Sequence, residues 1–100
     1  MSTLAEFTIA PLGKGESVSA YVARALAIVR ASGLPYRLGP MSTCIEGDWE
    51  AVMAVITRCF QDLQRDCNRV SVTVKIDYRR GPAGRMDAKV ASVTDKLTDR

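Results

Sequence analysis

The sequence contains no histidine, the side chain most often used as a general base and as a metal ligand. Its three cysteines, Cys44, Cys59 and Cys67, are an odd number and form no Cys-x-x-Cys pair. We therefore expect no Ser-His or Cys-His nucleophile, no disulfide framework and no metal site, and the residues suggest no cofactor. Unpaired thiols are typical of a reducing compartment, so we predict a cytoplasmic protein. No apolar run approaches the roughly 18 residues of a membrane span, and we expect no membrane contact.

Aromatic residues are also scarce, at 6% of the chain, and the 14 basic and 11 acidic residues give a net charge of only +3 without a basic block. Proteins that bind single-stranded RNA on a sheet need exposed aromatic side chains to stack bases, so we expect no nucleic-acid partner. The 100 residues, 47% of them hydrophobic, have the size and composition of one globular domain spanning residues 1–100.

Two apolar periodicities divide the chain into strands and helices. Alternation of apolar and polar residues predicts strands over 4–10, 35–38, 41–47 and 69–78. Apolar spacings of three and four predict one helix capped by Ser17 and ended at Gly33, and another capped by Asp48. A last helix follows from the spacing of Met86, Val90, Val93 and Leu97.

The resulting order is βαββαβ followed by a helix, which indicates an α+β, ferredoxin-like fold with an antiparallel sheet. Two helices cover one face of such a sheet, so the other is wet or is covered by the C-terminal helix or another subunit. The alternation places seven residues on this second face: Glu6, Thr8, Cys44, Glu46, Thr73, Lys75 and Asp77. The continuous β-branched side of 69–78 predicts that this strand is central in the sheet.

Three ionisable residues of that second face form the candidate site. Two acids, Glu46 and Asp77, beside Lys75 could anchor a cationic or amine-bearing ligand through charge-assisted hydrogen bonds. The alternative is a local ion pair, between Lys75 and either acid, that only neutralises the face.

Three motifs in this order resemble the small thiamine-binding, YkoF-like family. They are AEFTIAPLGxGESVSxYV at 5–22, GLPYRLGPMSTCIEGD at 33–48 and VKIDYR at 74–79, and together they span nearly the whole chain. The resemblance implies a ferredoxin-like subunit with a C-terminal helix. It also implies sheet-to-sheet homodimers that often pair into homotetramers, and binding of thiamine or its hydroxymethylpyrimidine portion without catalysis.

Carried over by position, the resemblance implies ligand contacts at Thr43 and Glu46 in the second motif and at Lys75 and Asp77 in the third. Thr8 belongs to this predicted site and lies on the open face. Thr43 falls at the alternate strand positions, whose side chains point to the other face of the sheet. We predict a non-catalytic binder of thiamine or its pyrimidine part rather than an enzyme. The alternative is an oligomeric regulatory or scaffold module whose open sheet face contacts only another protein.

Overall fold

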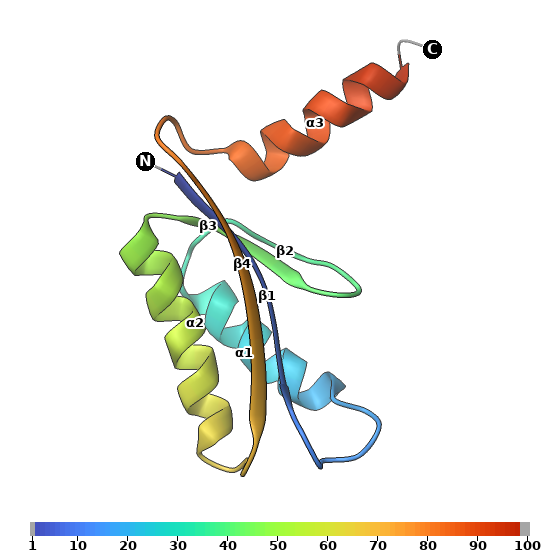
Figure 1. Cartoon of the computed structure of the whole chain (residues 1–100), viewed down its shortest axis with the longest axis vertical. Coiled ribbons are helices and arrows are strands. Elements are labelled where there is room, and N and C mark those ends of the chain that lie inside the picture. Colours follow the sequence, from blue (N-terminus) through green and yellow to red (C-terminus); the bar gives the residue numbers. More distant parts are fainter. Residues whose placement is uncertain (1, 99–100) are drawn as a thin grey trace.

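The structure is a computed structural model that describes residues 2–98. Strand β1 is Ser2–Pro11, helix α1 is Ser19–Ala31, and strands β2 and β3 are Tyr36–Leu38 and Thr43–Gly47. Helix α2 is Trp49–Gln64, strand β4 is Val70–Arg79 and helix α3 is Arg85–Thr98. All seven predicted elements are present, and the ferredoxin-like α+β fold is confirmed (Figure 1).

The four strands form one antiparallel sheet in the order β2-β3-β1-β4. Residue Ala5 of β1 lies opposite Ile45 on one side and Ile76 on the other, so these three side chains share a face. Helices α1 and α2 pack on that face and enclose the core with it. The buried core consists of Ala5, Phe7, Ile9, Ala25, Val29, Ile45, Val52, Val55, Ile56, Cys59, Leu63 and Cys67.

Strand β4 is an edge strand, so the prediction of a central position was wrong. The central strands are β1 and β3, and the β-branched face of β4 is only partly covered: Val72 is 38% exposed. Alternation showed correctly which face of β4 is apolar. It carried no information about how many neighbours the strand has, because a half-covered edge strand and a central strand have the same period.

The predicted helix caps are partly corrected. Helix α1 begins at Ser19 with Val18 at the cap position, so Ser17 lies one residue too early to cap it. Asp48 does occupy the cap position of α2, but its side chain makes no capping hydrogen bond. Gly33 follows α1 with a φ of 77°, the left-handed conformation that glycine adopts without strain.

An ion-pair cluster fixes α1 against α2. The guanidinium of Arg24 on α1 donates to the carboxylates of Asp62 and Asp66 at 2.9 and 2.8 Å. These contacts join α1 to the C-terminal end of α2 and so hold the two helices together. Helix α1 forms one wall of the cavity described below.

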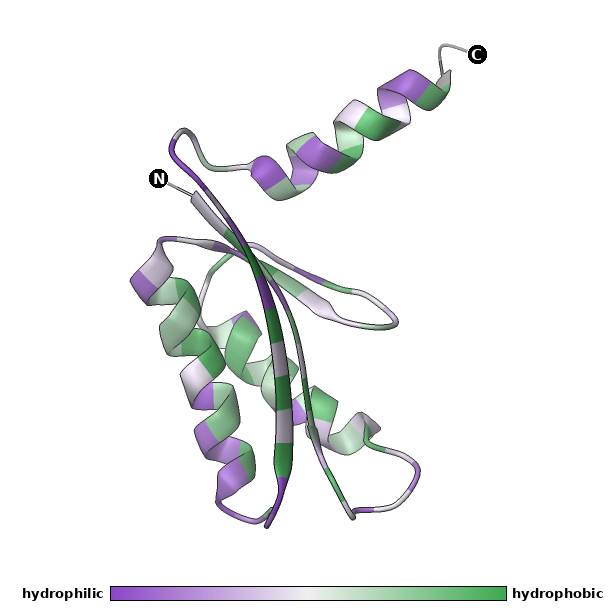
Figure 2. Cartoon of the chain, in the orientation of Figure 1, coloured by the Kyte–Doolittle hydropathy of each residue, from purple (hydrophilic) through white to green (hydrophobic). Residues whose placement is uncertain are grey.

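Helix α3 projects from one end of the sheet, away from α1 and α2 (Figure 1). Its apolar stripe remains accessible, with Val90, Val93 and Leu97 exposed by 50, 61 and 64%. Figure 2 shows apolar and polar bands alternating along α3, which extends beyond the body of the protein. No helix within residues 2–98 has the length and apolar character required to cross a membrane.

Candidate ligand-binding site

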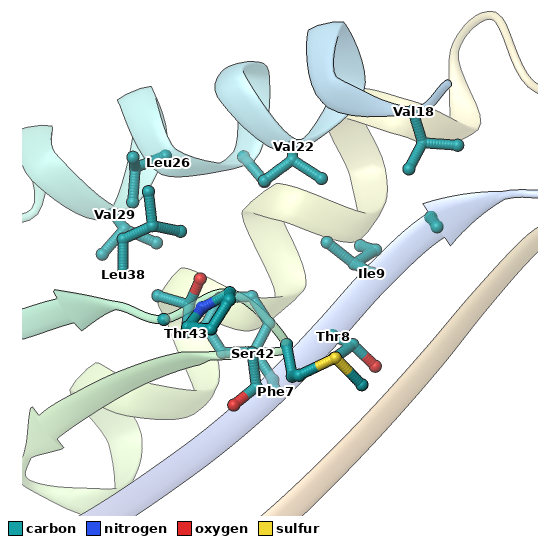
Figure 3. Close-up of a pocket in the computed structure, with 15 residues that line it drawn as sticks. Phe7, Thr8, Ile9, Val18, Val22, Leu26, Val29, Leu38, Ser42 and Thr43 are labelled. Atoms are coloured by element: carbon teal, nitrogen blue, oxygen red, sulfur yellow. The ribbon is translucent and has the colours of Figure 1, made fainter. Parts of the chain in front are cut away.

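A cavity of about 240 Å³ opens on the helix side of the sheet, between α1, β1 and the turn that joins β2 to β3. Val22 and Leu26 of α1 form one wall, and Phe7 and Ile9 of β1 form the floor (Figure 3). Leu38 and the turn residues 39–42 form the remaining wall. The lining is mainly apolar with a few hydroxyl groups, as is usual for sites that bind small organic molecules.

The cavity exists because β3 is shorter than β1. Pairing between β1 and β3 ends at Phe7 opposite Thr43, whereas pairing between β1 and β4 continues to Pro11 opposite Val70. Within residues 2–98, the stretch of β1 beyond Phe7 therefore has no strand partner on its β3 side. In an antiparallel strand, alternate residues direct their N–H and C=O groups to each side, so the backbone groups that point toward β3 in this stretch have no strand to pair with.

The turn between β2 and β3 closes the cavity from the other side. The Gly39 N–H donates to the Ser42 carbonyl at 2.8 Å, which folds residues 39–42 into a tight loop. A Cβ atom at Gly39 would lie 3.0 Å from that carbonyl oxygen, so the position favours glycine. Met41 in this loop is 84% exposed and an apolar ligand in the cavity could cover part of its side chain.

Three hydroxyl groups supply polar contacts in and around the cavity. Thr43 is 8% exposed and lies on the helix face, as the strand register predicted. Thr8 and Ser42 line the same cavity. The Ser42 hydroxyl donates to the Glu6 carboxylate at 2.9 Å, which links the turn to the opposite face of β1.

Glu46 is buried, with 2% exposure, and holds the first turn of α3. Its carboxylate accepts hydrogen bonds from the Arg85 N–H at 2.9 Å, the Met86 N–H at 3.1 Å and the Ser2 hydroxyl at 2.8 Å. A carboxylate at a helix N-terminus satisfies N–H groups that have no partner inside the helix, and it interacts favourably with the helix dipole. The Glu46 side chain therefore anchors α3 to β3.

Asp77 also contacts α3. Its carboxylate forms ion pairs with Arg85, at 2.8 Å, and with Lys89. The Arg85 guanidinium additionally donates to the carbonyls of Ser2 and Asp77. Hydrogen bonds from Lys89 and Arg85 hold the pKa of Asp77 below its ordinary value, so this acid is charged and already paired.

The open face of the sheet carries a second, shallower hollow. It is lined by Glu6, Cys44, Lys75 and Asp77 with Leu4, and Lys89 of α3 closes one end. Burial and the nearby Glu6 raise the pKa of the Cys44 thiol, so Cys44 is a protonated thiol at neutral pH and not a nucleophilic thiolate. Within residues 2–98 no cluster of three or more metal-ligating side chains is present.

The five predicted site residues do not meet in one place. Thr43 and Thr8 line the helix-side cavity, whereas Lys75 and Asp77 line the open-face hollow and Glu46 lies beneath α3. Direct ligand contact by Glu46, Asp77 and Lys75 stays a prediction. The sequence reasoning did not select the apolar walls of the cavity or Ser42, although Gly39-Pro40 already marked the turn that shapes it.

The contact between Glu46 and α3 is expected to depend on pH. Burial opposes ionisation of Glu46, but the N–H groups of Arg85 and Met86 and the Ser2 hydroxyl outweigh it and leave its pKa below the ordinary 4.5. A depressed carboxyl pKa stabilises the folded form fully above the unfolded value, and the contribution disappears as the pH falls through the folded value. We therefore expect hydrogen exchange in α3 to accelerate below about pH 4 and to stay unchanged, after correction for intrinsic rates, between pH 6 and 8. Equal acceleration in α2 would contradict this.

These features define a class of small α+β proteins with a cavity on the helix side of the sheet and a separate C-terminal helix. Residues 5–94 match the sequence model of the thiamine-binding protein family. The chain belongs to this thiamine-binding protein family.

Relatives and solved structures agree with this assignment. UPF0045 proteins of Mycobacterium tuberculosis and Mycobacterium bovis are each 45% identical over 94 residues, covering 93% of this chain and 92% of the relative. The crystal structure of a Methanocaldococcus jannaschii protein has a TM-score of 0.86 at 30% identity and covers 93% of this chain and 96% of that one. A Thermotoga maritima protein, whose name proposes a role in thiamine biosynthesis or salvage, has a TM-score of 0.82 at 22% identity, covers 93% of this chain and 99% of that chain, and shows the shared fold.

Proposed function

We propose that this protein binds thiamine or its hydroxymethylpyrimidine part, without catalysis, in the helix-side cavity. The observation that carries the proposal is a mainly apolar, partly open cavity beside the stretch of β1 that has no β3 partner. Its volume, about 240 Å³, corresponds to about eight water molecules at roughly 30 Å³ each, which is room for one substituted heterocycle. Membership of a thiamine-binding family supports the same ligand class.

The aminopyrimidine ring fits the chemistry of the cavity. Its faces would pack between Val22 of α1 and Phe7 of β1, and its amine and ring nitrogens would exchange hydrogen bonds with Thr43 and with the β1 backbone beyond the end of β3. The larger thiamine molecule would place its cationic thiazolium ring at the mouth, near Thr8 and Met41. In this arrangement Lys75 sets the local charge on the open face, and Glu46 and Asp77 support α3.

Filling the cavity should weaken binding. We expect Val22→Trp to weaken binding of thiamine and of hydroxymethylpyrimidine by about tenfold or more, because the indole would occupy the volume of the ring. Isothermal titration calorimetry measures the effect. Ala23→Trp is the matched control, because Ala23 is an exposed neighbour on the same helix and lies outside the cavity.

The outcome that contradicts the proposal is equally direct. If neither compound binds the wild type below millimolar concentration, the ligand class is wrong. If both bind and Val22→Trp binds as tightly as Ala23→Trp, the ligand class survives and the cavity is the wrong site. Circular dichroism of each variant separates loss of binding from loss of fold.

The proposal includes a homo-oligomer, a dimer or a tetramer, formed through the open sheet faces in a cytoplasmic protein. Two observations support self-association: α1 and α2 leave this face of the sheet uncovered, and α3 exposes Val90, Val93 and Leu97. The alternative, a regulatory or scaffold module, rests on the same exposed stripe. It predicts the same assembly without any small-molecule binding.

A further inference from the structure

The mouth of the helix-side cavity adjoins a charged hollow on the open face. The cavity and a smaller hollow of about 170 Å³ share Phe7, Thr8, Met41 and Ser42. The smaller hollow adds Glu6, Lys75 and Thr73. The two spaces meet where β1 has lost its β3 partner, so a ligand in the cavity can reach the charged side of the sheet past Ser42 and Thr8.

The carboxylate of Glu6 is held at this junction. It accepts a hydrogen bond from the Ser42 hydroxyl at 2.9 Å, a contact between residues 36 positions apart in the chain. Ser42 is itself part of the cavity wall. This hydrogen bond places the exposed carboxylate of Glu6 one side chain away from the cavity.

Lys75 lies opposite Glu6 in the β1–β4 register and contributes a positive charge to the same hollow. Side chains in directly opposite positions of an antiparallel pair have Cβ atoms roughly 5 Å apart. Yet in the part of the chain that the structure describes, residues 2–98, the Glu6 carboxylate bonds to Ser42 and forms no ion pair. A cationic group at the mouth of the cavity would therefore be attracted by Glu6 and repelled by Lys75.

We propose that Glu6, held by Ser42, makes the mouth of this cavity selective for a cationic group, and that Lys75 opposes it. The inference rests on the proposed function, since it assumes a heterocycle inside the cavity. The ligand class it defines is an uncharged aromatic ring joined to a permanent cation, as in thiamine, in preference to the uncharged ring alone. Glu6 acts here as a specificity-determining residue and Ser42 as a positioning residue.

Calorimetry with two probes, thiamine and hydroxymethylpyrimidine, tests the selectivity. We expect Glu6→Gln to weaken thiamine binding about three- to fivefold and to change hydroxymethylpyrimidine binding by less than about twofold. Lys75→Met should have the opposite sign and strengthen thiamine binding about two- to threefold. Ser42→Ala should lower the thiamine preference by a smaller factor than Glu6→Gln.

A salt titration gives an independent readout. Raising the ionic strength weakens the attraction between the Glu6 carboxylate and a cation that approaches it from solution, so wild-type thiamine affinity should fall with salt while hydroxymethylpyrimidine affinity stays constant. In Glu6→Gln this fall should be smaller. A change in cavity shape alone would alter both affinities at every salt concentration and would not change their salt dependence.

The results distinguish failure of the charge selectivity from failure of the proposed ligand binding. If both compounds bind and the ratio of their affinities is the same in wild type, Glu6→Gln and Lys75→Met, the charge selectivity is wrong and the cavity assignment stands. If neither compound binds the wild type, the proposed function fails and the selectivity fails with it. If Glu6→Gln does not fold, Lys75→Met decides, and an unchanged ratio there overturns the inference.

Discussion

Replacing Glu46 with alanine is expected to release helix α3 while the rest of the fold stays intact. The substitution removes the acceptor of the Arg85 and Met86 N–H groups and of the Ser2 hydroxyl. Because Glu46 is 2% exposed, water cannot readily replace it, and each buried donor left without an acceptor costs about 1 to 3 kcal/mol. Since α3 projects from the body, this loss falls on α3 docking and spares the core beneath α1 and α2.

Hydrogen exchange and limited proteolysis measure the release. In Glu46→Ala the amides of α3 should lose protection, and trypsin should cut after Arg85, which is 8% exposed in the native structure. Glu50→Ala is a suitable control, because Glu50 is an exposed acid in the first turn of α2. Protected α3 amides in Glu46→Ala would show that Arg85 and Asp77 suffice to hold the helix.

The same variant distinguishes the two candidate ligand sites. If the ligand lies in the helix-side cavity, Glu46→Ala should bind thiamine nearly as well as the wild type, since Glu46 does not line that cavity. If Glu46 contacts the ligand, as the family resemblance implies, binding should be lost. Glu46→Gln refines the comparison, because the amide keeps one acceptor for the N-terminus of α3.

The sequence predicted which face of the sheet a strand residue occupies, but it did not predict the hydrogen-bond partners of that residue's side chain. The period of two in β4 placed Lys75 and Asp77 on the open face, and the register confirms this. The partner of Glu46 could not be read in the same way, because it is the backbone of α3, 39 residues further along the chain. Backbone N–H groups leave no trace in residue type, so a carboxylate that caps a distant helix looks like a carboxylate free to bind ligand.

The sequence did not predict the cavity for a related reason. It arises from a difference in length between β1 and β3, and strand ends are less sharply encoded than strand periods. The predicted strand over 41–47 would have paired two further residues with β1 and shortened the stretch without a β3 partner. In the structure β3 begins at Thr43, and Met41 and Ser42 instead form the turn that lines the cavity.

Charged substitutions of the exposed apolar residues on α3 are expected to abolish self-association. A double variant, Val90→Asp with Val93→Asp, should reduce the particle to the 10.9 kDa mass of one chain. Both side chains are at least half exposed in the isolated subunit, and covering such a stripe is a common driving force of subunit contact. Two charges in that contact would weaken it by at least about 100-fold.

Light scattering coupled to size-exclusion chromatography reports the mass directly. The matched control is Ala91→Asp, which adds the same charge on the same helix but points away from the stripe. A wild-type protein that already elutes as one chain would contradict the proposed assembly. A double variant that keeps the wild-type mass would show that the open sheet face holds the subunits together without α3, and that the stripe of Val90, Val93 and Leu97 serves another partner.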